Sequence, residues 1–127
     1  MNLDKYIGLE NLEEKIVVKS DSASVYGSGL VDVFSTPAMI AFAEYTCMNS
    51  VAKLLPDGFS TVGTHVNISH EKATPIGDTV KCKCKLQNID RRKLVFVLEI
   101  TDSEGVIGKG THERFIIDVN KFVTKLK

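Results

Sequence analysis

Residues 35–58 read STPAMIAFAEYTCMNSVAKLLPDG, and this stretch decides the fold. Ser35 or Thr36 can cap the backbone amides of a first helical turn, and Pro37 fits that turn because no amide partner is lost there. The Pro-Asp-Gly sequence at the end of the stretch stops a helix. In between, apolar residues recur at helical steps of three and four: Met39, Ile40, Ala43, Cys47, Val51 and Leu54. The pattern predicts one long helix from Thr36 to Leu55, buried along much of its circumference.

The rest of the chain shows the period of two that is typical of strands. In residues 80–87, valine, cysteine and leucine alternate with lysine and glutamine, which predicts one buried face and one solvated face. Short turns join the segments and favour antiparallel hairpins over βαβ units. Gly108 and Gly110 share one face of the last strand, where we expect the helix backbone to approach closely. The expected strands are residues 14–19, 62–69, 80–87, 93–101 and 106–118.

These patterns predict a single α+β domain that covers residues 1–127. One antiparallel sheet of about five strands is expected to wrap around one long central helix, which is the hotdog architecture. A chain of 127 residues, 43% of them hydrophobic, can bury a core without the help of metals or disulfides.

The charge balance and the cysteine count exclude several classes of protein. Lys and Arg number 16, as do Asp and Glu, so no basic excess is available to bind nucleic acid or an anionic membrane. The 3 cysteines are an odd number, which argues against a disulfide framework. The first residues lack a secretory pattern, and no run approaches the ~18 apolar residues of a membrane span. We therefore expect a cytoplasmic protein.

Familiar catalytic motifs are missing from the sequence: HExxH, paired CxxC, GxGxxG, the Walker loop and GxSxG. We expect neither a bound metal nor nucleotide-dependent chemistry. Three polar residues nevertheless stand out. Glu44 lies within an apolar helix, where an ionised carboxylate is costly unless it is paired, although a solvated helix face also explains it. Thr36 could simply be the helix cap, and His70, which follows a strand, could simply be a surface residue.

Six short motifs occur in a fixed order: Phe34-Ser35-Thr36-Pro37, Glu44 eight residues after Thr36, Val62-Gly63-Thr64, Ile68-Ser69-His70, Ala73-Thr74-Pro75-Ile76-Gly77 and Gly108-Lys109-Gly110-Thr111-His112-Glu113-Arg114-Phe115. Together they resemble the fluoroacetyl-CoA thioesterase family of hotdog proteins. The resemblance runs from about Val33 to Phe122. Its specificity lies in the ordered set, since no single motif is specific.

The resemblance implies a hydrolase that cleaves the coenzyme A thioester of a short or small acyl group. The family's catalytic triad falls on Thr36, Glu44 and His70, and its glycine-bearing strand matches at Gly63. We expect Gly63 and Arg114 to bind the substrate. Glu44 would act as general base or nucleophile, while His70 would orient it and pass a proton to the leaving sulfur. Thr36 would hold the attacking group or donate to the oxyanion. The amide of Gly63 would also donate to the oxyanion. No cofactor is implied beyond the coenzyme A of the substrate.

Two further expectations concern subunits and coenzyme A. Eight helical residues rise ~12 Å, too far for Thr36 and Glu44 to touch within one regular helix. Either Thr36 lies on a loop folded back over the helix, or a second subunit completes the site. The resemblance implies at least a homodimer that shares the site at its interface. Arg91 and Arg92 could bind the phosphates of coenzyme A, although a charged hairpin tip is more often only solvated.

Substrate selectivity and two alternative functions remain open. The family's fluoroacetyl selectivity depends on an aromatic gate upstream of the helix, and residues 24–30 here read SVYGSGL, onto which no gate maps. We therefore expect a general acyl-CoA thioesterase rather than an enzyme of fluoroacetate resistance. A hotdog hydratase or dehydratase would use an Asp and His pair, whereas this helix carries Glu44 and neither Asp nor His. A non-catalytic acyl-CoA-binding module has little reason to place a carboxylate beside a thioester.

Overall fold

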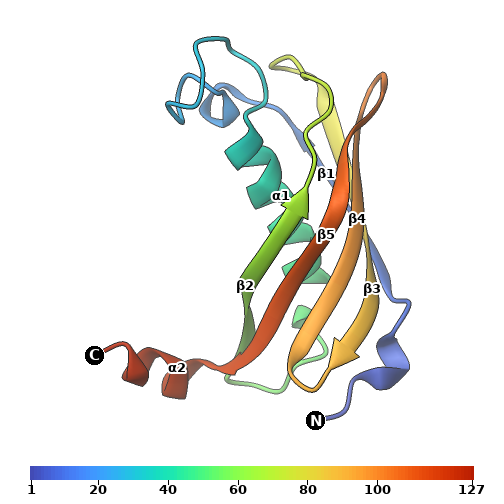
Figure 1. Cartoon of the computed structure of the whole chain (residues 1–127), viewed down its shortest axis with the longest axis vertical. Coiled ribbons are helices and arrows are strands. Elements are labelled where there is room, and N and C mark those ends of the chain that lie inside the picture. Colours follow the sequence, from blue (N-terminus) through green and yellow to red (C-terminus); the bar gives the residue numbers. More distant parts are fainter.

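The computed structural model describes residues 1–127 as one sheet and one long helix with three short helical elements (Figure 1). The strands are β1 (Glu10–Ile16), β2 (Phe59–Ile68), β3 (Thr79–Asp90), β4 (Lys93–Asp102) and β5 (Gly105–Asp118). The helices are α1 (Thr36–Ala52) and α2 (Val119–Lys125), with 3-10 turns at Asp4–Tyr6 and Lys19–Asp21. All strand pairs are antiparallel, in the order β1-β3-β4-β5-β2. The predicted hotdog fold is confirmed.

The core lies between α1 and the inner face of the curled sheet (Figure 1). Alternation on β3 is as predicted, with its lysines exposed and its apolar residues and cysteines buried. The three cysteines, Cys47 on α1 and Cys82 and Cys84 on β3, are all buried and free. The residues that α1 buries are Ala38, Met39, Phe42, Ala43, Thr46, Cys47 and Val51.

Several elements differ from the boundaries that hydrophobicity predicts. β2 begins at Phe59 rather than at residue 62, and β3 ends at Asp90 rather than at residue 87. β1 spans Glu10–Ile16 rather than residues 14–19, because polar residues form its inner face. Asn11, for example, donates from its side chain to the Thr46 carbonyl of α1 at 3.2 Å. α1 ends at Ala52, and the following leucines, Leu54 and Leu55, pack against the core from a turn rather than from the helix.

Gly108 and Gly110 allow a close approach, but not the expected approach of the helix backbone. A β-carbon at Gly108 would lie 3.1 Å from Cε of Met39 and would collide with the Ser69 carbonyl oxygen. A β-carbon at Gly110 would collide with the backbone of β2 at Asn67. The glycines therefore bring β5 close to the end of β2, while α1 contributes only a side chain.

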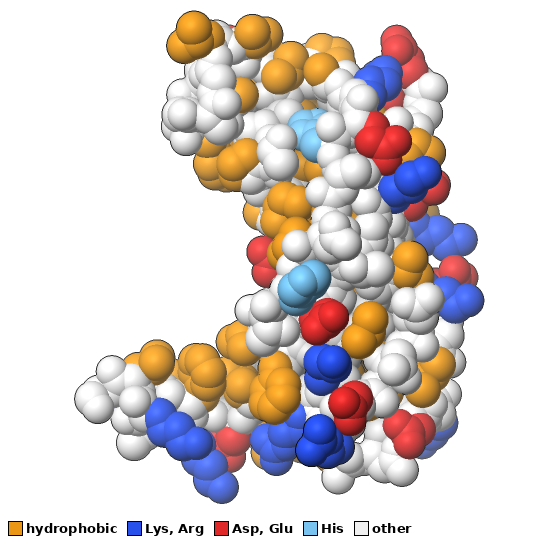
Figure 2. Space-filling model, in the orientation of Figure 1, with side chains coloured by type: hydrophobic (Ala, Val, Ile, Leu, Met, Phe, Trp, Pro, Cys, Tyr) orange, Lys and Arg blue, Asp and Glu red, His pale blue; other side chains and the backbone are white.

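β2 is an edge strand, and its outer side has no partner in the chain. Residues 63–67 of β2 are all exposed. The molecule is hollowed along this flank, between the loop region before α1 and the projecting α2 (Figure 2). α2 buries none of its residues. No helix of the chain meets the length and hydropathy that crossing a membrane requires.

Candidate active site

At the start of α1, Thr36 faces His70. Ser35 is the helix cap, since its side-chain oxygen accepts from the Ala38 amide at 3.2 Å. The Thr36 hydroxyl is thus free for another partner, and Oγ1 lies 2.8 Å from Nδ1 of His70. The other ring nitrogen of His70, Nε2, is buried and has no hydrogen-bond partner in the chain. Burial lowers the pKa of His70, which favours the neutral ring. Two of the three predicted catalytic residues therefore meet as a pair, the Thr36–His70 pair.

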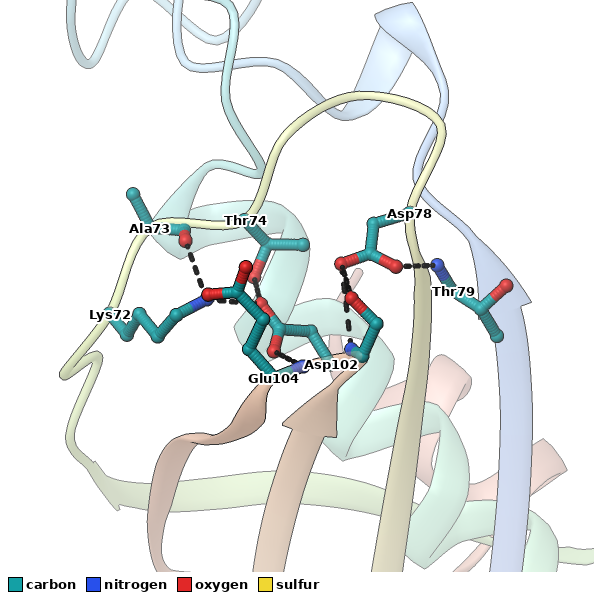
Figure 3. Close-up of polar contacts among 8 residues, drawn as sticks. Lys72, Ala73, Thr74, Asp78, Thr79, Asp102 and Glu104 are labelled. Carbon is teal, nitrogen blue, oxygen red and sulfur yellow. Dashed lines mark hydrogen bonds and ion pairs between the residues drawn. The ribbon is translucent and has the colours of Figure 1, made fainter.

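The segment between β2 and β3, which carries His70, is held to the end of β4 by a buried carboxylate (Figure 3). Asp102 has no exposed side-chain surface and accepts from Lys72 Nζ at 2.7 Å and from the Thr74 hydroxyl at 2.9 Å. Burial opposes ionisation of Asp102, but the hydrogen bonds from Lys72, the Glu104 amide and Thr74 outweigh it and lower its pKa. We call Asp102, Lys72 and Thr74 the Asp102 cluster.

The Asp102 cluster also reaches the chain that leads into α1. The Phe34 amide donates to the Thr74 carbonyl at 2.8 Å, and a β-bridge joins Val33 to Pro75. The segments before Thr36 and after His70 are therefore held to each other. This arrangement fixes the Thr36–His70 pair from both sides.

Glu44 points from the middle of α1 toward β2 and β5. Its Oε2 lies 3.4 Å from Nη1 of Arg114 and 3.7 Å from Nε2 of His112. A β-carbon on Gly63 would collide with the same oxygen, so the missing side chain leaves room for the carboxylate. The Glu44 side chain remains 38% exposed, so it is paired and also reachable from solvent. We call Glu44, Gly63, His112 and Arg114 the Glu44 cluster.

Arg114 is the best-anchored member of the Glu44 cluster, with a side chain that is 7% exposed. Its Nε donates to the Thr61 hydroxyl at 2.8 Å, and its Nη2 donates to the Thr61 carbonyl at 3.0 Å. Its Nη1 lies 3.1 Å from Nε2 of His112 and also faces Glu44. Burial lowers the pKa of Arg114, and Glu44 opposes that shift. The result is a fixed cation beside a carboxylate, the arrangement that stabilises developing negative charge.

The Thr36–His70 pair and the Glu44 cluster do not touch within one chain. Thr36 is itself the first residue of α1, so it does not lie on a loop folded back over the helix. Eight residues of regular helix put Thr36 and Glu44 ~12 Å apart along the axis. His70 donates to or accepts from Thr36, and no hydrogen bond joins it to Glu44. Within one chain the two groups are therefore separate.

Arg91 and Arg92 lie at the β3–β4 turn, at the opposite end of the sheet from His70 (Figure 1). The guanidinium of Arg92 lies over the Phe59 ring, 5.8 Å from its centroid. The two arginines line an open depression of about 520 Å³ together with Asp90, Lys93 and Phe115. The turn therefore offers a cationic surface away from the two polar groups.

His112 and Thr61 belong to the site, although sequence reasoning assigns them no role. Alternation on β5 puts His112 on the same inner face as Arg114, and this spacing is the signal that could have found it. Thr61 offers no such signal, because its contact with Arg114 depends on the register between β2 and β5. No group of three or more His, Cys, Asp or Glu side chains is arranged to hold a metal ion.

Comparisons with known proteins place the chain in a family. A family model described as fluoroacetyl-CoA-specific thioesterase matches residues 17–120. A fluoroacetyl-CoA thioesterase of Streptantibioticus cattleyicolor is 34% identical over 96 residues, 76% of this chain and 69% of the relative. A solved structure of a fluoroacetyl-CoA thioesterase variant in complex with acetyl-CoA has a TM-score of 0.90 at 28% identity, covering 94% of this chain and 95% of the other. A hot-dog-like protein from Thermanaerovibrio acidaminovorans shares the fold, with a TM-score of 0.90 at 20% identity over 99% of this chain and 95% of the other. The chain thus belongs to the fluoroacetyl-CoA-specific thioesterase family and is an acyl-CoA thioesterase of hotdog fold.

Proposed function

We propose that the enzyme hydrolyses the coenzyme A thioester of a short or small acyl group, with Glu44 as the reacting carboxylate. The observation that carries the proposal is the place of Glu44 Oε2, which lies against Gly63 with no side chain between and beside the Arg114 cation. A thioester laid across β2 at Gly63 meets this oxygen directly. The substrate named for the family and the acetyl-CoA complex of the relative support a small acyl group.

Two chemical routes are open to Glu44. As a general base it takes a proton from water, and that water attacks the carbonyl carbon. As a nucleophile it forms the new C–O bond itself, and water then cleaves the resulting anhydride. In both routes the C–S bond breaks and the sulfur leaves as a thiolate. Donors from the Gly63 amide and the Arg114 guanidinium stabilise the oxyanion and hold the substrate.

Thr36 and His70 act at the leaving sulfur in this proposal. When the Thr36 hydroxyl donates to Nδ1 of His70, the hydrogen of the neutral ring sits on Nε2. Nε2 makes no hydrogen bond within the chain, so its hydrogen is not committed to another group, and we propose that it meets the leaving sulfur. The neutral ring keeps this hydrogen and stabilises the thiolate through the hydrogen bond, since giving it up would leave an imidazolate. The thiolate then takes its proton from the solvent or from the new acid.

We infer that two copies form the working enzyme by pairing the free edges of β2. An unpaired strand edge is a template for another strand, and the exposed residues 63–67 border the hollow flank (Figure 2). In an antiparallel pairing centred between Val66 and Asn67, Gly63 of one copy lies opposite His70 of the other. The Glu44 cluster of one copy then meets the Thr36–His70 pair of its partner.

Two smaller proposals complete the function. Arg91 and Arg92 bind phosphates of coenzyme A, because guanidinium groups match phosphate oxygens with paired donors. The enzyme works in the cytoplasm, where buried thiols such as its three free cysteines stay reduced.

A thiol-release assay with a series of acyl-CoA substrates tests the activity. We expect the highest turnover with acetyl-sized groups, a steep fall with chain length, and similar turnover of acetyl-CoA and fluoroacetyl-CoA. Binding of acyl-CoA without thiol release would favour the non-catalytic module. Loss of the double bond of an enoyl-CoA without thiol release would favour the hydratase.

Light scattering tests the dimer separately. The expected mass is about twice that of the 14.0 kDa chain at the concentration used for the assay. A single species of 14.0 kDa that still releases thiol would contradict the shared site.

A further inference from the structure

His112 is the fully buried member of the Glu44 cluster, and its two ring nitrogens have different partners. Nδ1 lies 2.7 Å from the carbonyl oxygen of His65 on β2. A carbonyl oxygen only accepts, so Nδ1 must carry a hydrogen. In the neutral ring Nε2 then has no hydrogen and can only accept.

The hydrogen bond of the second nitrogen is to a group that only donates, while Oε2 of Glu44 lies farther away, at 3.7 Å. Nε2 of His112 lies 3.1 Å from Nη1 of Arg114, whose guanidinium has no acceptor. Both contacts therefore require the same form of the ring, neutral with its hydrogen on Nδ1. Protonation would set an N–H group of His112 against an N–H group of Arg114. Burial is the largest effect on the pKa of His112 and lowers it, and the charge of Arg114 lowers it as well. The His65 carbonyl and Glu44 raise it.

His112 also links the cluster to an irregularity in β2. The pairing of β2 with β5 shifts between Gly63 and His65, and the His65 carbonyl is the group that His112 holds. A β-carbon on Gly63 would lie 3.2 Å from Cε1 of His112. The imidazole ring thus supports the stretch of β2 on which the thioester is proposed to lie.

We propose that His112 is a positioning residue that, as a neutral acceptor, holds Nη1 of Arg114 toward Glu44. It acts through Arg114 and contacts no substrate. Without this acceptor the guanidinium keeps its two bonds to Thr61 but loses the partner that fixes the direction of Nη1. The charge facing Glu44 and the oxyanion is then less well placed, so kcat falls more than KM rises. The inference rests on the proposed roles of Glu44 and Arg114.

Two substitutions separate the two hydrogen bonds of the ring. His112→Gln places an amide oxygen near the position of Nε2 and keeps the acceptor for Arg114. His112→Asn reaches only the position of Nδ1 and keeps the donor for the His65 carbonyl. We expect His112→Gln to keep kcat within about threefold of the parent and His112→Asn to lower it about tenfold or more, with similar KM and melting temperature in the two variants. Equal kcat values, or a lower value for His112→Gln, overturn the proposal.

A spectroscopic measurement on the unchanged protein does not depend on turnover. The ¹⁵N shifts of its histidine side chains report which nitrogen carries the hydrogen. At neutral pH we expect His112 to be neutral with its hydrogen on Nδ1. An imidazolium, or a hydrogen on Nε2, overturns the proposal. If Glu44 variants kept full activity, the proposed function would fail while this ring assignment could still hold, so the two failures are distinguishable.

Discussion

The Glu44 cluster and the Thr36–His70 pair flank the same strand, β2, but the fold holds them differently. Four hydrogen bonds fix the Arg114 guanidinium beside Glu44. A single hydrogen bond joins Thr36 to His70, and Nε2 of His70 stays without a partner. The difference shows that the two groups depend on the chain to different degrees. Contacts within one chain fix the Arg114 guanidinium beside Glu44, whereas one ring nitrogen of His70 is left uncommitted.

Removing the Glu44 carboxylate tests the Glu44 cluster, and we expect this change to have the largest effect on turnover. Glu44→Gln keeps the shape of the side chain but cannot accept a proton or attack a carbonyl. Turnover should fall by about two to four orders of magnitude in the thiol-release assay, the range of a lost base or nucleophile. Glu113→Gln, a matched change on β5 beside Arg114, should keep turnover near that of the parent. Near-normal turnover of Glu44→Gln would remove Glu44 from the chemistry.

Removing the imidazole of His70 tests the Thr36–His70 pair. His70→Ala should lower turnover more than about tenfold with little change in melting temperature, because the residue has one hydrogen bond to lose. Gln87→Ala, a change at an exposed polar residue of β3 away from the edge of β2, is the control. A lower melting temperature with unchanged turnover per folded molecule would make His70 a structural residue.

The rate of the parent enzyme should also depend on pH, because His70 changes its protonation state at low pH. Its lowered pKa means that the neutral ring persists below the ordinary value of 6.5, so the rate should fall only at pH values under that point. This fall should be absent in His70→Ala. The same fall in both proteins would assign it to another group.

The Asp102 cluster holds the segment that carries His70, and removing its carboxylate should have the smallest effect on the rate. Asp102→Asn should lower the melting temperature by a few degrees, roughly the shift that 1 kcal/mol gives in a domain of this size. The pKa of Asp102 is lower in the folded state than in the unfolded state, so its ionised form stabilises the fold. The full stabilisation is present above the unfolded pKa, and it is lost as the pH falls through the folded pKa. The difference from the parent should thus be full at neutral pH and shrink below about pH 4. Exposed Asp57→Asn is the control, and a pH-independent difference would contradict the assignment.

Local signals explain how much could be predicted from the sequence. The cap, the apolar steps and the stop of α1 lie within one stretch of chain, and β3 alternates from Val80 to Gln87. β1 could not be placed in the same way, because Asn11 faces inward to bond with α1. The resemblance to a family pointed to the site residues. It could not show which of them meet, since Thr36 and His70 are 34 residues apart and Glu44 and Arg114 are 70 apart.

The burial of all three cysteines has a consequence for an enzyme that handles thioesters. An acyl group passes readily from one sulfur to another when the receiving sulfur is a thiolate. Cys47, Cys82 and Cys84 are at most 1% exposed, so none of them is within reach of a substrate at the surface. This burial matters most at Cys84, since the hydrogen bond with Cys47 lowers the pKa of its thiol. The substrate therefore meets no thiol of the enzyme that could capture its acyl group. Water, rather than a cysteine of the protein, is left as the final acceptor.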